Sequence, residues 1–182
     1  FDEGLESNPA FTKDAMTPTV ARIAGNKRLW KRGISGAALA FDGYTSKVTL
    51  SSPEAPDYLD KELSLETWVA LGAYPWNLAS LVQQTNPSGS RSKGYVLGVN
   101  ETGHPLLQVC VENTWETLVA DKALDLYRWT HVAATFDGDK GQMTIYLDGE
   151  PYGRRNNVHG EISAAPTDIV IGLNTIPGEA TR

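Results

Sequence analysis

The sequence predicts an all-β protein, an antiparallel sandwich or barrel with very little helix. Short runs rich in Val, Ile, Leu, Thr and aromatic residues alternate with segments whose residues favour turns. Several runs alternate apolar and polar side chains with the period of two that a strand requires. No window sustains an apolar period of 3.6 residues, because the best helix candidate, TPTVARIAGNKRLW at 17–30, contains Pro18 and Gly25.

From about Gly43 onward, strand and turn segments follow one another regularly. Turn segments such as NPSGSRSKG, DGDKG and DGEP separate the β-rich runs. The expected strands are residues 47–52, 62–71, 79–85, 94–100, 105–113, 115–120, 129–136, 142–147 and 168–173.

Strand faces and one hairpin can be assigned from the pattern. In QMTIYLD, the apolar residues Met143, Ile145 and Leu147 share one parity, which predicts a strand with one face on a core. GYVLGVN at 94–100 is only mildly polar on both faces, as expected of an interior strand. Asp148-Gly149 predicts a type I′ turn, which needs positive φ at both central positions.

Composition bounds the class of protein. The chain has 182 residues, enough for one domain, and shows no apolar run long enough to cross a bilayer. Its net charge of −6 and pI near 5.0 argue against nucleic acid as a partner. Its one cysteine, Cys110, excludes an intrachain disulfide and is expected on a buried strand.

Four segments carry a family resemblance in the right order. The stretch WTHVAATFDGDKGQMTIYLDGEPYG at 129–153 resembles the W-x-H-V-A-x-T-(F/Y)-D-G and Y-(L/V)-D-G signature of laminin-G-like, concanavalin A-like jelly rolls. GISGAALAFDGYTSKVTL at 33–50 and LSLETWVAL at 63–71 resemble two further segments of that superfamily, and Phe1-Asp2 resembles its opening.

The resemblance implies one antiparallel jelly-roll β-sandwich over residues 1–182. Members usually end with a further strand after the I-G segment, whereas this sequence stops at GEATR soon after DIVIGLN. We therefore expect the domain to lack its closing strand and to be part of a longer, multidomain chain.

The resemblance also implies a function. Laminin-G-like domains occur attached to secreted bacterial glycoside hydrolases, so we expect a non-catalytic accessory module. It would bind a glycan or pack against an adjacent catalytic domain, in an extracellular or periplasmic location. A glycoside hydrolase of the same fold and a protein-binding adhesion module remain as alternatives.

A catalytic pair would need two carboxyl groups on one face of the sheet. Glu62, Ser64 and Glu66 share a face, and laminarinase-type glucanases carry Glu-x-Asp-x-Glu at such spacing. Here Ser64 replaces the middle acid, which breaks the pattern. We therefore assign no catalytic residue, and Glu62 with Glu66 belong to the alternative.

A structural calcium ion is implied by the resemblance. In similar folds an acidic residue near the amino terminus and a carbonyl of the Phe-Asp-Gly turn hold Ca²⁺, a cation that takes oxygen ligands. Carried over, the ligands are Asp2 and Asp42-Gly43, although Asp42-Gly43 is equally well explained as a turn alone.

For sugar binding, an aromatic face and planar hydrogen-bonding groups are needed near a rim. Trp68 and Trp129 lie in strand signatures and are expected to pack in the core or against a sheet. Trp76 follows a proline turn and Trp115 follows the ENT turn, so both are candidate platforms. The proposed carbohydrate-binding residues are Trp76, Gln83, Arg91, Tyr95 and Trp115.

Overall fold

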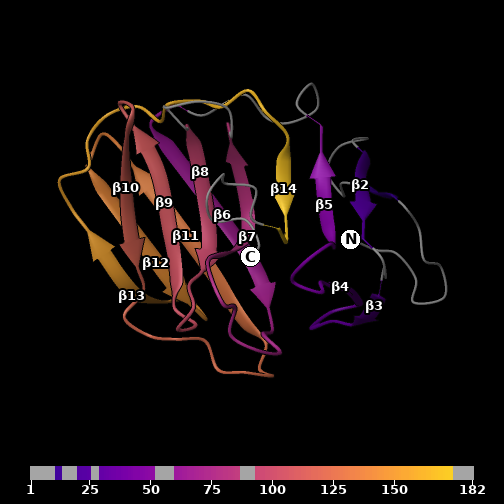
Figure 1. The fold of residues 1–182 in the computed structure, drawn as a ribbon. Coiled ribbons are helices and arrows are strands. Elements are labelled where there is room, and N and C mark those ends of the chain that lie inside the picture. Colours follow the sequence, from indigo (N-terminus) through magenta and orange to yellow (C-terminus); the bar gives the residue numbers. More distant parts are fainter. Residues whose placement is uncertain (1–10, 14–19, 26–28, 52–59, 87–92, 174–182) are drawn as a thin grey trace.

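A computed structural model describes residues 11–13, 20–25, 29–51, 60–86 and 93–173. Within these ranges the chain forms antiparallel strands and no helix. Figure 1 shows a large sheet in front of a smaller one, with loops gathered at the ends of the strands. The all-β prediction is therefore confirmed.

The front sheet has eight strands, in the order β1-β2-β5-β14-β7-β8-β9-β10. It contains every expected strand between residues 79 and 119, and β14 closes the gap between β5 and β7. Its strands are β1 (Phe11–Lys13), β2 (Val20–Ala24), β5 (Lys47–Leu50), β14 (Ile169–Ile171), β7 (Ala79–Thr85), β8 (Gly94–Val99), β9 (Pro105–Val111) and β10 (Thr114–Val119).

The second sheet has four strands, in the order β13-β12-β11-β6. A separate two-stranded ribbon precedes β5. The strands of the second sheet are β6 (Glu62–Val69), β11 (Thr130–Asp137), β12 (Gln142–Leu147) and β13 (Glu150–Arg155), and those of the ribbon are β3 (Leu29–Arg32) and β4 (Ala37–Ala40).

The core lies between the two sheets. Leu97 and Leu107 from the front sheet meet Val132, Phe136 and other apolar side chains from the second sheet, all essentially without exposed surface. Alternation places these residues inward, and the burial of their apolar surface is the main favourable term in folding. Strand β8 is buried on both faces, as predicted for an interior strand.

The hairpin between β12 and β13 follows the sequence prediction. Asp148 and Gly149 have φ angles of 51° and 87°, the two positive values of a type I′ turn. Met143, Ile145 and Leu147 are buried, which confirms the predicted core face of β12.

One open side of the sandwich is closed by a charged pair. Strands β10 and β13 are the edges of the two sheets on that side. Arg155 of β13 forms an ion pair with Glu116 of β10 and donates a hydrogen bond to the Thr117 carbonyl at 2.8 Å. These contacts join the two sheet edges.

Other predictions concern the ends of the chain and its cysteine. Segment 17–30, the best helix candidate, contains strand β2 and part of β3. The missing closing strand concerns the region after Leu173, which lies outside the described residues. Cys110 is buried on β9, and burial raises the pKa of its thiol. Among the described residues no helix could span a membrane.

Candidate functional site

Two loops that are distant in sequence meet at one end of the sandwich. The Tyr127 N–H donates to the Leu71 carbonyl at 2.8 Å, and the Tyr74 hydroxyl donates to the Leu124 carbonyl at 2.9 Å. Leu71 and Leu126 also form a parallel bridge. Figure 1 shows these two connections, after β6 and before β11, close together at the lower end of the sandwich. Segments 71–76 and 121–129 therefore form one surface.

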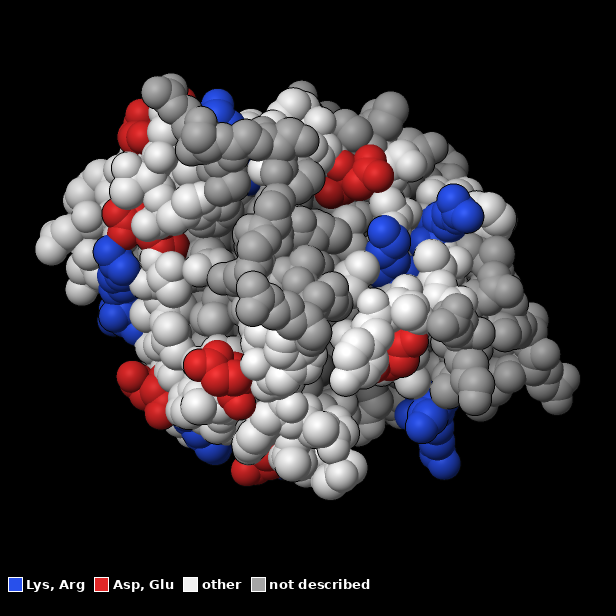
Figure 2. Space-filling view, viewed as in Figure 1, with Lys and Arg blue, Asp and Glu red and all other residues white. Residues whose placement is uncertain are grey.

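Large exposed apolar side chains gather on and beside these segments. Tyr127 is 82% exposed, and exposed fractions near one half are found for three further aromatic residues. We call this set the aromatic rim: Trp68, Tyr74, Trp76, Leu126 and Tyr127. Figure 2 shows uncharged residues at the lower end of the same face, with acidic and basic residues among and beside them. Clusters of exposed apolar groups on a soluble protein are a mark of interaction sites.

Tyr127 has a backbone conformation that its residue type rarely adopts. Its φ is 61°, in the left-handed region, which costs a residue with a Cβ about 1 kcal/mol or more. The hydrogen bond to Leu71 holds this conformation. Backbone strain of this kind is often found at functional sites, and here it presents an almost fully exposed phenol ring.

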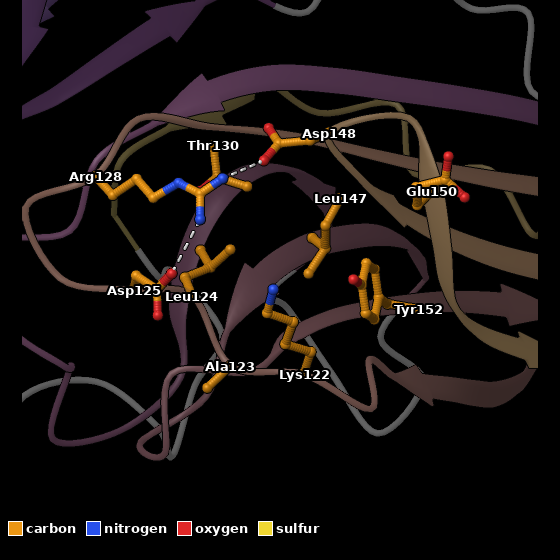
Figure 3. A pocket seen from close by; sticks show the side chains of 10 residues that line it. All are labelled: Lys122, Ala123, Leu124, Asp125, Arg128, Thr130, Leu147, Asp148, Glu150 and Tyr152. Atoms are coloured by element: carbon orange, nitrogen blue, oxygen red, sulfur yellow. Dashed lines mark hydrogen bonds and ion pairs between the residues drawn. The ribbon is translucent and has the colours of Figure 1, made fainter.

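A pocket lies beside the rim (Figure 3). Loop 121–129 and the β12–β13 hairpin form its walls, and the core residues Leu124 and Leu147 contribute apolar surface. The complete lining is Lys122, Ala123, Leu124, Asp125, Arg128, Thr130, Leu147, Asp148, Glu150 and Tyr152.

Charged groups define the geometry of the pocket. The Arg128 guanidinium lies 3.2 Å from the Asp125 carboxylate and 3.1 Å from that of Asp148. The Lys122 ammonium lies over the Tyr152 ring, 5.1 Å from its centroid, in a cation–π contact. The pocket therefore combines apolar surface with two cations and three carboxylates, two of which are paired with Arg128.

A second cluster of side chains, which includes a histidine and a glutamate, lies on the outer face of the four-stranded sheet. The Trp68 ring packs against the His131 ring, with centroids 5.2 Å apart, and His131 Nε2 lies 3.4 Å from Glu66 Oε2. Of the two positions expected for Trp68, in the core or against a sheet, the structure shows the second. Leu65 and Val69 take the inward positions of β6, so alternation turns Trp68 outward, where it is 47% exposed.

The structure does not bring the predicted carbohydrate-binding residues together. Trp76 is exposed at the rim, whereas Trp115 is half-buried on β10, opposite Cys110. Gln83 is buried and accepts a hydrogen bond from Ser80 at 2.5 Å. Tyr95 faces the core, where burial raises its pKa to about 12. Neither buried side chain is presented to a ligand, and Arg91 lies outside the described residues.

Asp42 forms a turn. One of its carboxylate oxygens accepts the N–H groups of Tyr44, Thr45 and Ser46, and the other accepts the Thr45 hydroxyl at 2.6 Å. Burial alone would raise the Asp42 pKa, but these hydrogen bonds outweigh it and hold the pKa well below its ordinary value.

The metal prediction is not resolved by the described residues. The Asp42 carboxylate is committed to its turn, so only the backbone carbonyls of Asp42-Gly43 fit the expected role as calcium ligands. Asp2, the other predicted ligand, lies outside the described residues. Across the described ranges, no cluster of three or more His, Cys, Asp or Glu side chains could hold a metal ion.

Sequence reasoning missed most of this end of the molecule. It did not single out Tyr127, Lys122, Arg128 or Tyr152. The run DKALDLYRW carries no motif, and its contacts are with residues distant in sequence, some about fifty positions earlier and others twenty to thirty positions later. One signal was available: a Tyr and a Leu in a segment rich in charged residues, outside every expected strand.

Two facing antiparallel sheets with loops at their ends define the chain as a jelly-roll β-sandwich. The chain belongs to the concanavalin A-like lectin/glucanases superfamily, whose laminin-G family profile matches residues 42–181. A search of curated proteins by sequence finds no match.

Two solved structures with a similar fold are parts of glycan-degrading enzymes. Domain 4 of AbnA, an extracellular arabinanase from Geobacillus stearothermophilus solved in complex with arabinotriose, is 16% identical with a TM-score of 0.65, covering 89% of this chain and 78% of that one. The carbohydrate-binding domain of the Ruminococcus gnavus IT-sialidase, bound to α2,3 sialyllactose, is 15% identical with a TM-score of 0.56, covering 68% and 69%.

A toxin domain has the same fold. The binding domain of Paraclostridial Mosquitocidal Protein 1 is 13% identical with a TM-score of 0.70, covering 97% of this chain. The chain spans less than half the length of that domain, since only 44% of it is covered. At these identities the likeness shows the fold.

Proposed function

We propose that this chain is a non-catalytic glycan-binding module of a carbohydrate-active enzyme, and that it binds through the aromatic rim. The observation that carries the proposal is the gathering of Trp76, Tyr74 and Tyr127 on two loops that are hydrogen-bonded to each other. A rigid scaffold with functional side chains on its loops is a common arrangement for binding sites.

The chemistry of the rim suits a sugar. A pyranose or furanose ring has an apolar C–H side, which packs on an aromatic ring, and a hydroxyl edge, which needs hydrogen-bonding groups. The rim supplies exposed rings, and the neighbouring pocket supplies Asp125 and Arg128. Because the loop is already ordered by the bonds at Leu71 and Leu124, little conformational entropy is lost on binding.

The comparisons support the proposal. Two of the similar structures are parts of glycan-degrading enzymes and are described in complex with an oligosaccharide. By the same reasoning we propose an extracellular or periplasmic location, since the AbnA enzyme is described as extracellular. We also propose that an adjacent catalytic domain is present in the same protein.

A glycan array followed by calorimetry tests the function. The parent should bind at least one class of glycan. Trp76→Ala and Tyr127→Ala should each weaken binding roughly fivefold, because the loss of one aromatic contact costs about 1 kcal/mol of binding free energy. Tyr44→Ala is the matched control, because Tyr44 is 63% exposed in the turn between β4 and β5, outside the rim.

Two outcomes would contradict the proposal. Binding that survives the double variant Trp76→Ala/Tyr127→Ala would place the glycan elsewhere on the molecule. A parent that binds no glycan on the array would favour the other role considered, packing against an adjacent catalytic domain.

We also propose that a structural calcium ion is held by Asp2 together with carbonyls of the Asp42-Gly43 turn. Four hydrogen bonds already hold the turn carboxylate in place, so the charged ligand would be Asp2. Chelation with EDTA should then lower the Tm of the parent and leave that of Asp2→Asn unchanged. Equal Tm values of the parent with and without EDTA would refute the proposal.

A further inference from the structure

Two cations extend into the pocket beside the aromatic rim. Figure 3 shows the Lys122 ammonium and the Arg128 guanidinium extending into the pocket from two sides, near the apolar side chains of Leu124 and Leu147. Lys122 forms no ion pair with any residue that the structure describes. Its charge is therefore available to a ligand.

Arg128 retains hydrogen-bonding capacity. A guanidinium carries five N–H donors, and single contacts to Asp125 and Asp148 use two of them. The two carboxylates are held against Arg128, so they fix its position and partly neutralise it. The guanidinium is pre-organised in this way to take a further acceptor.

The third carboxylate of the lining is directed elsewhere. In Figure 3 the Glu150 side chain extends away from both cations. The space between Lys122 and Arg128 is thus bordered by the two cations, by apolar surface and by the Asp125 and Asp148 carboxylates that are paired with Arg128. An anionic group in this space would lie near both cations, and the interaction would have the moderate strength of a partly exposed ion pair.

The same geometry disfavours stacking of a neutral sugar in the pocket. Lys122 lies over the Tyr152 ring at 5.1 Å and covers the face on which a sugar would pack. The pocket therefore selects for charge, whereas the exposed rings of the aromatic rim select for apolar sugar faces.

We propose that the pocket binds the carboxylate of an acidic sugar residue, a uronic or sialic acid, within a glycan held by the aromatic rim. This inference rests on the proposed glycan-binding function. Lys122 supplies the unpaired positive charge, and Arg128 supplies directed N–H donors to the carboxylate oxygens. Lys122 is then the residue that determines specificity for acidic over neutral glycans.

Paired oligosaccharides test this assignment. Calorimetry would compare trigalacturonic acid with its methyl ester, and 3′-sialyllactose with lactose, so that each pair differs in the acidic group. We expect at least one acid to bind about tenfold or more tightly than its neutral partner. This is the gain in affinity expected from one charge-assisted hydrogen bond. That preference should shrink as ionic strength rises.

Variants assign the preference to the pocket. Lys122→Met should lower the affinity for the acid to that of the neutral partner, and should leave binding of the neutral partner unchanged. Lys31→Met is the matched control, since it removes the same charge from an exposed site on β3. The control should retain the preference.

The outcomes separate this inference from the proposed function. Equal binding of acid and neutral partner, with binding lost in Trp76→Ala/Tyr127→Ala, would overturn the acidic specificity and leave glycan binding at the rim intact. Loss of the preference in Lys31→Met as well would also overturn it. A sulfated galactose oligosaccharide that binds as tightly as the carboxylates would overturn the choice of a carboxylate. A parent that binds no glycan would overturn both proposals.

Discussion

The carboxylate of Asp148 joins the β12–β13 turn to segment 121–129 and to the start of β11. Its Oδ2 lies 3.1 Å from the Arg128 guanidinium, and its Oδ1 accepts the His131 N–H at 2.9 Å. The Asp148 N–H in turn donates to the His131 carbonyl at 2.8 Å. One turn residue thus positions the pocket arginine and the first residues of β11.

Replacement of Asp148 should separate its two roles. Asp148→Asn keeps an acceptor for His131 and tolerates positive φ, so its free energy of unfolding should stay within about 0.5 kcal/mol of the parent. Asp148→Ala loses the acceptor and is strained at φ 51°, which should cost about 1 to 2 kcal/mol. Urea denaturation measures both, and equal stabilities of the two variants would contradict this account.

Substitution of Tyr127 by glycine should leave the protein more stable than substitution by alanine, while both substitutions weaken binding. The side chain is 82% exposed and contributes little to packing, whereas glycine adopts φ 61° without steric cost. Tyr127→Gly should therefore be more stable than Tyr127→Ala by about 1 kcal/mol. Both variants should show the same loss of glycan affinity. A Tyr127→Gly that is less stable than Tyr127→Ala would show that φ is not strained.

Acid should remove the stability that Asp42 contributes. Because its folded pKa lies below the ordinary value of 3.8, the contribution is fully present at pH values above about 4 and is lost as the pH falls toward the folded value. The difference in unfolding free energy between the parent and Asp42→Asn should thus be constant from pH 5 to 7 and shrink below pH 4. Denaturant titrations at several pH values check this, and a difference that grows in acid would contradict it.

The alternative of a hydrolase using Glu62 and Glu66 makes an opposite prediction to ours. Glu66 lies beside His131 on the outer sheet face, and Ser64 occupies the position between the two glutamates. We expect no release of reducing sugar from a panel of β-glucans by the parent or by Glu66→Gln. Hydrolysis by the parent that Glu66→Gln abolishes would establish the enzyme instead.

The sequence predicted the fold far better than the site, and the reason is the range of the interactions involved. The β12–β13 hairpin depends on Asp148-Gly149 and on alternation over a few residues, all of which are local signals. Strand β13 itself escaped prediction because Pro151 and Gly153 are poor strand residues, and pairing with β12 overrides that preference. The parity of Trp68 with Glu66 would have selected the sheet face over the core for this residue.

The aromatic rim had no comparable local signal. Tyr127 and Leu71 meet through a backbone hydrogen bond between loops about fifty-five residues apart, and nothing in either segment encodes the other. Gln83 and Tyr95 flank a polar loop, which suggested a surface position. Their strands lie inside the front sheet, and that arrangement buries them.

The buried thiol of Cys110 gives this chain a practical property. Because the side chain is enclosed in the sheet and its pKa is raised, thiol reagents should leave the folded protein untouched near neutral pH. A cysteine introduced at the exposed Lys31 of β3 would then be the site that takes a fluorophore. The label would follow the folded molecule, and any reaction at Cys110 would report the moment at which the sandwich opens.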